Sequence, residues 1–140
     1  MRRTLVGLIL SLSLVGIANA QEDAKKELDK FQGKWKAEKL IFGGNDAPGD
    51  IAAKFVITCK GNEFIPVESP TDIATIKLDP SAKPKTIDLT EKNKKVSLGI
   101  YELSGDTLKL CFAEPGTDRP KMFESAKGSN VVYVVLKREK

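Results

Sequence analysis

The sequence contains no histidine. This absence excludes Ser-His-Asp and Cys-His catalysis, imidazole metal sites and a histidine proton shuttle near neutral pH. Two cysteines are too few for a structural zinc site, and neither a phosphate-binding loop nor a dinucleotide fingerprint is present. A pair of carboxylates is the one catalytic arrangement left open. We therefore expect no enzyme, no metal and no cofactor.

Beyond the first twenty residues, no apolar run is long enough to cross a bilayer. Those twenty residues begin with Arg2 and Arg3, continue with an apolar stretch of about 13 residues, and end in the small-x-small triplet 18–20. A membrane span needs about 20 apolar residues. The pattern predicts a signal peptide over 1–20, cleavage after Ala20, and export to the periplasm or the extracellular space.

The sequence also lacks a strong charge of one sign. Its formal net charge is +4, and removal of Arg2 and Arg3 leaves 21 basic against 19 acidic residues. Nucleic-acid-binding domains are usually strongly basic on one face, so we expect no nucleic-acid partner. The remaining residues 21–140 suit one domain with its own core, and we expect a monomer.

The two cysteines, Cys59 and Cys111, fall in different strand phases. Cys59 alternates with Phe55 and Ile57 on an apolar face, whereas Cys111 alternates with Thr107 and Lys109 on a polar face. Opposite faces of strands bring two thiols together only through a bulge. Two separate thiols are the favoured reading, although an exported protein permits a disulfide.

Residues 22–31 carry the only helical periodicity, and Gly33 ends it. After them, tight-turn signals containing glycine recur at 60–63, 104–107 and 127–130 and favour antiparallel hairpins. The fold class is therefore all-β, an up-and-down antiparallel barrel of about eight strands with a short N-terminal helix. The expected strands are 34–42, 53–60, 63–68, 73–78, 86–90, 96–104, 107–113, 121–126 and 131–138.

Two details of the pattern refine this barrel. The apolar phase of the first strand changes after Ala37, which predicts a bulge near Glu38 and Lys39. Residues 131–136 are apolar on both faces, so the outer face needs a cover, and helix 22–31 is the candidate.

Gly33-Lys34-Trp35, directly after the helix, resembles the Gly-x-Trp signature of lipocalins and related calycin barrels. In that superfamily a basic residue near the end of the last strand packs over the tryptophan. Arg138 stands in the matching place. The resemblance implies that Gly33, Trp35 and Arg138 close one end of the barrel, with the guanidinium stacked on the indole.

A longer resemblance rests on four ordered motifs: FQGKW at 31–35, LDPSAKPKTIDL at 78–89, LGIYELSGDTLKLC at 98–111 and GTDRP at 116–120. Together they look like a family of uncharacterised exported domains abundant in planctomycete bacteria and thought to be lipocalin-like. That family implies export and a barrel, but no catalytic residue. The match is less clear over residues 43–72.

An eight-stranded barrel holds either packed side chains or one small ligand. The aromatic residues expected to face the interior and line such a ligand site are Phe64, Tyr101, Phe112, Phe123 and Tyr133. Residues 43–50, with three glycines, would form the flexible lip of the mouth. A core filled by these side chains is the alternative.

The function expected from the sequence is an exported lipocalin-like domain that binds a small apolar molecule. The alternative is a packed-core interaction module of the cell envelope, which would bind a protein or glycan through loops 79–85 and 115–120. In the second loop, Asp118 and Arg119 form either a rigid recognition turn or a turn that pairs locally.

Overall fold

The structure, a computed structural model, describes residues 21–139. The predicted leader, residues 1–20, lies outside the described residues. An N-terminal helix covers residues 21–31, as the sequence predicts. The remaining elements are β1 (Gly33–Phe42), β2 (Asn45–Asp46), α2 (Gly49–Ala52), β3 (Val56–Lys60), β4 (Glu63–Pro66), β5 (Ala74–Asp79), β6 (Thr86–Thr90), β7 (Val96–Ser104), β8 (Thr107–Phe112) and β9 (Val132–Arg138).

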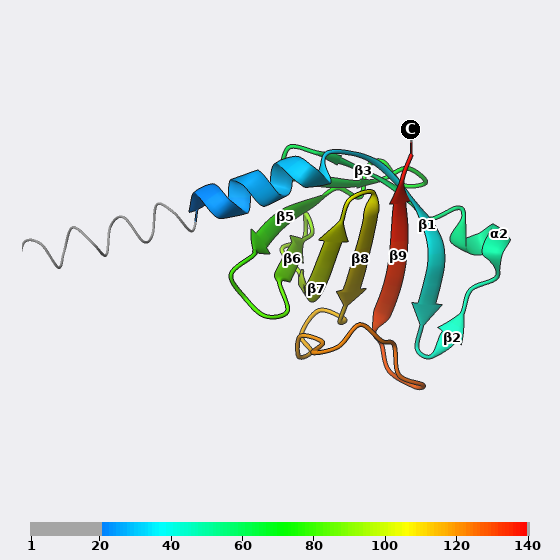
Figure 1. Ribbon diagram of the computed structural model, residues 1–140. Helices are drawn as coiled ribbons and strands as arrows, with labels where there is room; N and C mark the ends of the chain where they lie inside the picture. Colours follow the sequence, from blue (N-terminus) through cyan, green and yellow to red (C-terminus); the bar gives the residue numbers. More distant parts are fainter. Residues whose placement is uncertain (1–20, 140) are drawn as a thin grey trace, which may run out of the picture.

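Nine strands form one antiparallel sheet that closes on itself. The order is β2-β1-β3-β4-β5-β6-β7-β8-β9, and β1 also pairs with β9 from Trp35↔Arg138 to Phe42↔Val132. The other edge of β1 is shared, because β3 pairs with its first half and β2 with its last two residues. Eight strands therefore make the barrel, and β2 is a short addition. The predicted all-β, up-and-down barrel with a short helix is confirmed (Figure 1).

The bulge predicted in the first strand is confirmed. The register between β1 and β9 shifts between Ala37 and Lys39. An extra residue at this point bends the strand and increases its twist, which closure of a barrel requires. It also keeps Leu40 and Phe42 on the inner face, since they pair with Val134 and Val132.

The two ends of the barrel differ. One end, here called the helix end, carries the N-terminal helix, the turn at 61–62, the loop 80–85 and the turn at 105–106. The other, here called the loop end, carries the connections 43–55, 67–73, 91–95 and 113–131. Figure 1 shows the helix across one end and the long β8–β9 connection at the other.

The predicted strand 121–126 is wrong. These residues are part of the long connection from β8 to β9. In the closed sheet β9 already pairs with β8 on one edge and β1 on the other, so no edge is left for another strand. The segment instead covers the outside of β8 and β9: the Cys111 Sγ lies 3.5 Å from the carbonyl oxygens of Met122 and Glu124.

The expected position of the helix is also wrong. It was expected to cover the outer face of the last strand, but that face is covered by residues 122–125. The helix lies instead across the helix end, where Phe31 joins the core cluster and Leu28 packs against it. Within residues 21–139, no helix is long and apolar enough to cross a membrane.

Candidate functional site

The helix end is closed by Trp35, which is fully buried. Its indole Nε1 donates a hydrogen bond of 2.8 Å to the carbonyl oxygen of Phe31, the last helical residue. The Arg138 guanidinium carbon lies 4.2 Å from the centroid of the Trp35 ring. The same guanidinium donates hydrogen bonds to the carbonyl oxygens of Gln32 and Lys30. It therefore joins the last strand to the end of the helix.

Gly33 makes this closure possible. Its φ of +118° is one that side chains rarely adopt, and a Cβ there would lie 3.2 Å from the Arg138 Nη1. The structure thus brings together Gly33, Trp35 and Arg138, the three residues selected for this role.

The aromatic residues selected as ligand-lining separate into two groups. Phe64 and Tyr101 belong to the core cluster, and Phe112 packs at its edge. Phe123 and Tyr133 contact each other instead, with ring centroids 6.4 Å apart, and neither belongs to that cluster. Because Val132, Val134 and Leu136 pair with the inner residues of β8, the period of two turns Tyr133 outward beside Cys111. The expectation that Phe123 and Tyr133 face the interior is not met.

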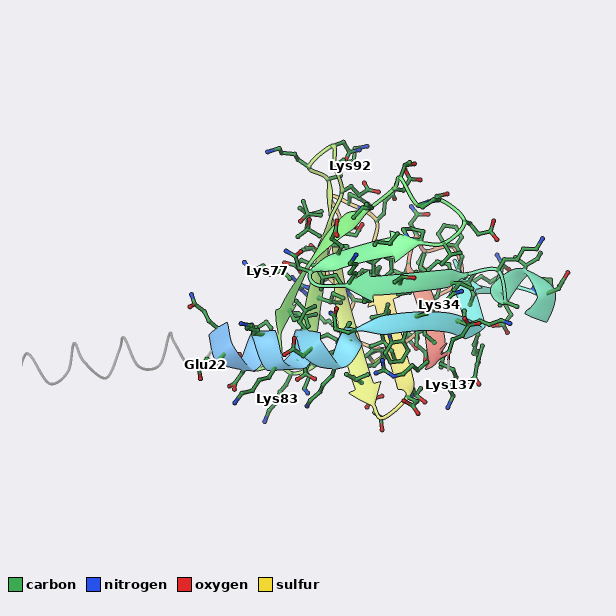
Figure 2. The ribbon with its side chains drawn as sticks, turned by 90° about the horizontal axis from the view of Figure 1, so that it is seen from above. Glu22, Lys34, Lys77, Lys83, Lys92 and Lys137 are labelled. Atoms are coloured by element: carbon green, nitrogen blue, oxygen red, sulfur yellow. The ribbon has the colours of Figure 1, made fainter. Side chains whose placement is uncertain are left out.

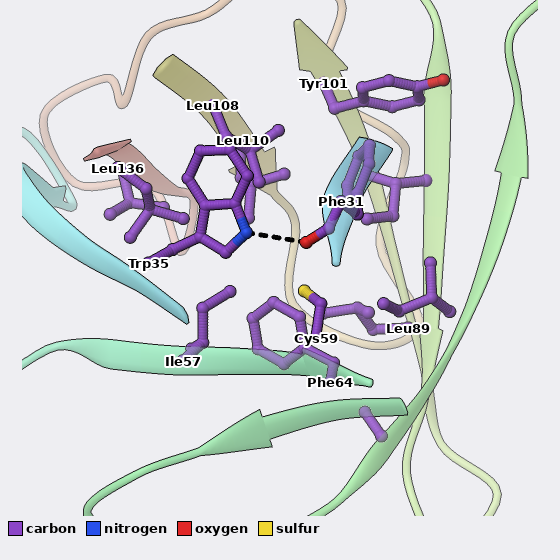
Figure 3. Close-up of a cluster of buried hydrophobic side chains, with 14 of the residues drawn as sticks. Phe31, Trp35, Ile57, Cys59, Phe64, Leu89, Tyr101, Leu108, Leu110 and Leu136 are labelled. Carbon is purple, nitrogen blue, oxygen red and sulfur yellow. Dashed lines mark hydrogen bonds between the residues drawn. The ribbon is translucent and has the colours of Figure 1, made fainter. Parts of the chain in front are cut away.

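The middle of the barrel is filled by side chains. Phe31 and Tyr101 meet edge to face, with ring centroids 5.1 Å apart and planes at 78°. Figure 3 shows the indole of Trp35 enclosed by aliphatic and aromatic side chains from several strands, with the Tyr101 hydroxyl turned away from it. The cluster contains Phe31, Trp35, Ala37, Ile57, Cys59, Phe64, Ala74, Ile76, Leu78, Ile87, Leu89, Tyr101, Leu108, Leu110, Val134 and Leu136. The filled-core alternative describes this part of the barrel.

The packing stops short of the loop end, where a hollow of about 320 Å³ remains. We call it the mouth hollow. Its lining is Phe42, Ser97, Phe112, Ala113, Glu114, Pro115, Asn130 and Val132. Four of these residues face inward by strand register, since Phe42 and Phe112 both pair with Val132, and Ser97 pairs with the core residue Leu89. This is the position of the mouth of a barrel.

Gly99 leaves room for Phe112, which lines the mouth hollow. It lies opposite Phe112 in the β7–β8 register, and a Cβ on it would come within 2.5 Å of the Phe112 ring and 2.7 Å of the Cys111 carbonyl oxygen. Phe112 therefore occupies the space that any other side chain at position 99 would take. Sequence reasoning named Phe112 but missed Phe42, Ser97 and Val132. The phase change in β1 was the available signal for Phe42.

The loop expected to be a flexible lip is tied down. Residues 43–50 contain β2 and the start of α2, and three backbone donors fix their first part. Gly43 N donates to the Val131 carbonyl oxygen, Gly44 N to the Ser125 Oγ, and Gly128 N to the Gly43 carbonyl oxygen. The rim of the mouth hollow is thus held by contacts between two connections far apart in sequence.

In the second candidate loop, residues 115–120, the Arg119 side chain is paired with other parts of the barrel. The Arg119 Nη1 lies 2.8 Å from the Asp88 Oδ1 and donates a 2.8 Å hydrogen bond to the Gly99 carbonyl oxygen. Arg119 therefore fastens the long connection to the outside of β6 and β7, over a long sequence separation. Because its guanidinium is already bound within the protein, a role for Arg119 in recognising a partner has no structural support.

The titratable groups of the described region include two cysteines with raised pKa values. Both cysteines are buried free thiols; burial raises the pKa of Cys59 to about 12, against the opposing charge of Arg138, and burial also raises the pKa of Cys111. Among residues 21–139, no group of three or more acidic, histidine or cysteine side chains is placed to hold a metal ion. The feature of this region that suits a ligand is the mouth hollow, whose walls are largely apolar.

No protein-family model, curated protein or solved structure matches this chain. The fold alone defines the class of protein, a closed eight-stranded antiparallel barrel with one end covered by a helix. A lipocalin-like binding domain is compatible with that class.

Proposed function

We propose that this protein is an exported, monomeric, lipocalin-like domain that binds one small apolar molecule in the mouth hollow. The main support for this proposal is that inward-facing apolar side chains remain partly exposed to solvent at the loop end of an otherwise filled barrel. Phe42 is 54% exposed although its strand position faces inward, and Phe112 and Val132 are only half-buried.

The chemistry of the lining supports a ligand that is mostly apolar with one polar group. Three apolar side chains would lose contact with water when a ligand enters, and each Å² of apolar surface buried is worth about 25 cal/mol. Ser97 and the pair formed by Asn130 Nδ2 and Glu114 Oε2, 2.8 Å apart, supply polar atoms at the rim. Apolar walls with a few placed polar groups are the usual composition of a small-molecule site, and 320 Å³ suits a small ligand.

A fluorescence titration with the neutral apolar probe N-phenyl-1-naphthylamine tests this proposal. The wild-type protein should give a saturable increase in emission. Ser97→Phe should weaken binding at least 10-fold, because the new ring fills the hollow from its inner wall. The matched control is Ser104→Phe, which makes the same change at the exposed far end of the same strand and should leave binding unchanged.

Two outcomes would contradict the proposal. The first is a wild-type protein that shows no saturable binding. The second is binding that survives Ser97→Phe unchanged, which would place the probe elsewhere. Circular dichroism spectra that match the wild type show that each variant is folded.

Export and family membership are part of the same proposal. The leader pattern of residues 1–20 supports export, and the four ordered motifs support membership in the exported planctomycete family. Mass spectrometry of the protein recovered from an expressing bacterium should give a chain beginning at Gln21. An intact leader in the recovered protein would argue against it. Sedimentation velocity should show a single species at the mass of one chain.

The filled core favours a second candidate, a cell-envelope interaction module that uses its loops. Arg119 is paired with Asp88 and Gly99, whereas residues 116–118 and most of loop 79–85 remain exposed. A pull-down from the periplasm with wild-type protein and with Lys83→Glu separates the two candidates. A partner lost only in the variant supports the interaction module.

A further inference from the structure

A second hollow lies at the helix end of the barrel, between the N-terminal helix and β5. It measures about 610 Å³, and we call it the helix groove. Its lining comes from three segments far apart in sequence: Gln21, Ala24, Lys25 and Leu28 of the helix, Asn62 of the β3–β4 turn, and Ile76, Lys77, Leu78, Asp79, Pro80 and Ser81 at the end of β5. It shares no lining residue with the mouth hollow.

The groove exists because β4 is shorter than β5. The two strands pair at only two positions, Glu63↔Thr75 and Phe64↔Ala74, and Ile76 N then donates to the Asn62 carbonyl oxygen. Beyond that bond β5 continues to Asp79 without a neighbour from β4. The helix lies beside this unpaired edge, and the space between them is not filled by side chains.

Both walls of the groove are fixed. Every residue of β5 from Thr75 to Asp79 pairs with β6 on its other edge. The end of the helix is held by the hydrogen bonds of Trp35 and Arg138 to its last carbonyl groups, and its middle by an ion pair of 3.3 Å between Glu27 Oε2 and Lys85 Nζ. A preformed groove avoids much of the ordering cost of binding.

The chemistry of the groove is amphipathic. Its apolar lining consists of the partly exposed Ala24, Leu28 and Pro80 and of the buried Ile76 and Leu78. Lys25 and Lys77 supply two exposed ammonium groups, and within residues 21–139 neither forms an ion pair. Figure 2 shows Lys77 on the side of the barrel next to the helix.

The one acidic side chain of the lining is already engaged. Asp79 Oδ1 accepts hydrogen bonds from both the backbone N and the Oγ of Ser81, and these bonds lower the pKa of Asp79. Its carboxylate stays ionised and is turned back toward its own loop, so the two lysines are the cationic groups of the lining.

The free edge of β5 is a poor site for an added peptide strand. Since Ile76 N points toward β4, the period of two turns the N–H and C=O of Leu78 to the same side. The next residue in that phase is Pro80, which has no N–H. A peptide would gain only one paired residue from this edge, so the apolar walls and the two cations determine the occupant.

We propose that the helix groove binds a single fatty-acid anion of medium chain length, with its tail along Leu28 and Leu78 and its carboxylate at the ammonium groups of Lys25 and Lys77. This site is independent of the mouth hollow. Its volume lies within the usual range of about 300–1,000 Å³ for small-molecule sites.

Isothermal titration calorimetry with decanoate and with neutral 1-decanol, both below the concentration at which they aggregate, tests the proposal. The wild-type protein should bind one decanoate. The double variant Lys25→Gln/Lys77→Gln should weaken decanoate binding at least 10-fold and leave decanol binding within twofold. Ala24→Trp should weaken both, because the indole fills the groove.

Matched controls separate this site from general cation effects and from the mouth hollow. Lys83→Gln/Lys92→Gln removes the same charge elsewhere on the surface and should leave decanoate affinity unchanged (Figure 2). Ser97→Phe, which blocks the mouth hollow, should also leave it unchanged.

Three results would overturn the inference: no decanoate binding to the wild type, equal affinity in the Lys25→Gln/Lys77→Gln and control variants, or loss of decanoate binding in Ser97→Phe alone. The last result would support the proposed function and remove only the helix groove. The lysine variants change exposed side chains, so they stay folded and decide the question even if Ala24→Trp disturbs the helix.

Discussion

The guanidinium of Arg138 lies 4.2 Å from the centre of the Trp35 ring, and these two residues also face each other in the β1–β9 register. The contact therefore occurs where the first and last strands close the barrel. Because the same guanidinium binds the carbonyl oxygens of Gln32 and Lys30, it also satisfies acceptors at the end of the helix that have no partner within it. The Arg138 side chain thus contacts the closing strands, the end of the helix and the indole that covers the core.

Trp35→Ala should lower the free energy of unfolding by about 3–5 kcal/mol, because a fully buried indole leaves a large cavity. It also removes the hydrogen bond to the Phe31 carbonyl oxygen. Urea unfolding followed by circular dichroism measures the loss. A decrease below about 1 kcal/mol would mean that the indole does not support the core.

Arg138→Lys should destabilise the protein by about 1–2 kcal/mol although it keeps the charge. An ammonium group cannot stack on the indole and bind two carbonyl oxygens at once, as the planar guanidinium does. Lys137→Arg, a change of similar size on the exposed face of the same strand, is the control and should stay within about 0.5 kcal/mol of the wild type. Equal stability of the two variants would show that charge alone matters at position 138.

The barrel could be predicted because its local signals agree with one another. Glycine turns set the hairpins, the phase change after Ala37 located the bulge, and Trp35 with Arg138 indicated which strands close the sheet. These features depend on neighbours in sequence or on strand periodicity, both of which a single sequence carries.

The errors arose where both faces of a strand are apolar. In β9, Val132 and Tyr133 are equally plausible inner residues, and only the register with β8 decides between them. Residues 121–126 precede a glycine turn signal and therefore resemble the first strand of a hairpin, but a closed sheet has no edge to accept them. The helix groove could not be predicted at all, because it follows from the two-residue pairing of β4 with β5 and from the position of the helix in space.

The buried thiol of Cys59 should make stability depend on pH above about 9. Burial raises its pKa from 9.0 to about 12, so between these values the folded chain keeps a proton that the unfolded chain releases. Its contribution is fully present below pH 9 and declines as the pH rises toward 12. Between pH 8 and 10 the wild type should lose about 1.4 kcal/mol more than Cys59→Ala, as urea unfolding at each pH would show. Equal losses would mean that the Cys59 thiol ionises normally in the folded protein.

Gly99→Ala should destabilise the protein by about 1–3 kcal/mol, because the added methyl group would overlap the Phe112 ring and the Cys111 carbonyl oxygen. The ring can move but the carbonyl oxygen is fixed in the β7–β8 ladder, so replacing the ring relieves only part of the strain.

Thermal unfolding of four variants, namely Gly99→Ala, Phe112→Leu, the double variant and Gly49→Ala, separates these contributions. Phe112→Leu in the Gly99→Ala background should recover some of the lost stability, and the double-mutant cycle should show a favourable coupling of about 0.5 kcal/mol or more. Gly49→Ala is the control, since its Cβ would meet nothing within 4 Å, and it should cost little. Strict additivity of Gly99→Ala and Phe112→Leu would mean that the two side chains do not compete for the same space, and the position of Phe112 in the mouth hollow would then not depend on Gly99.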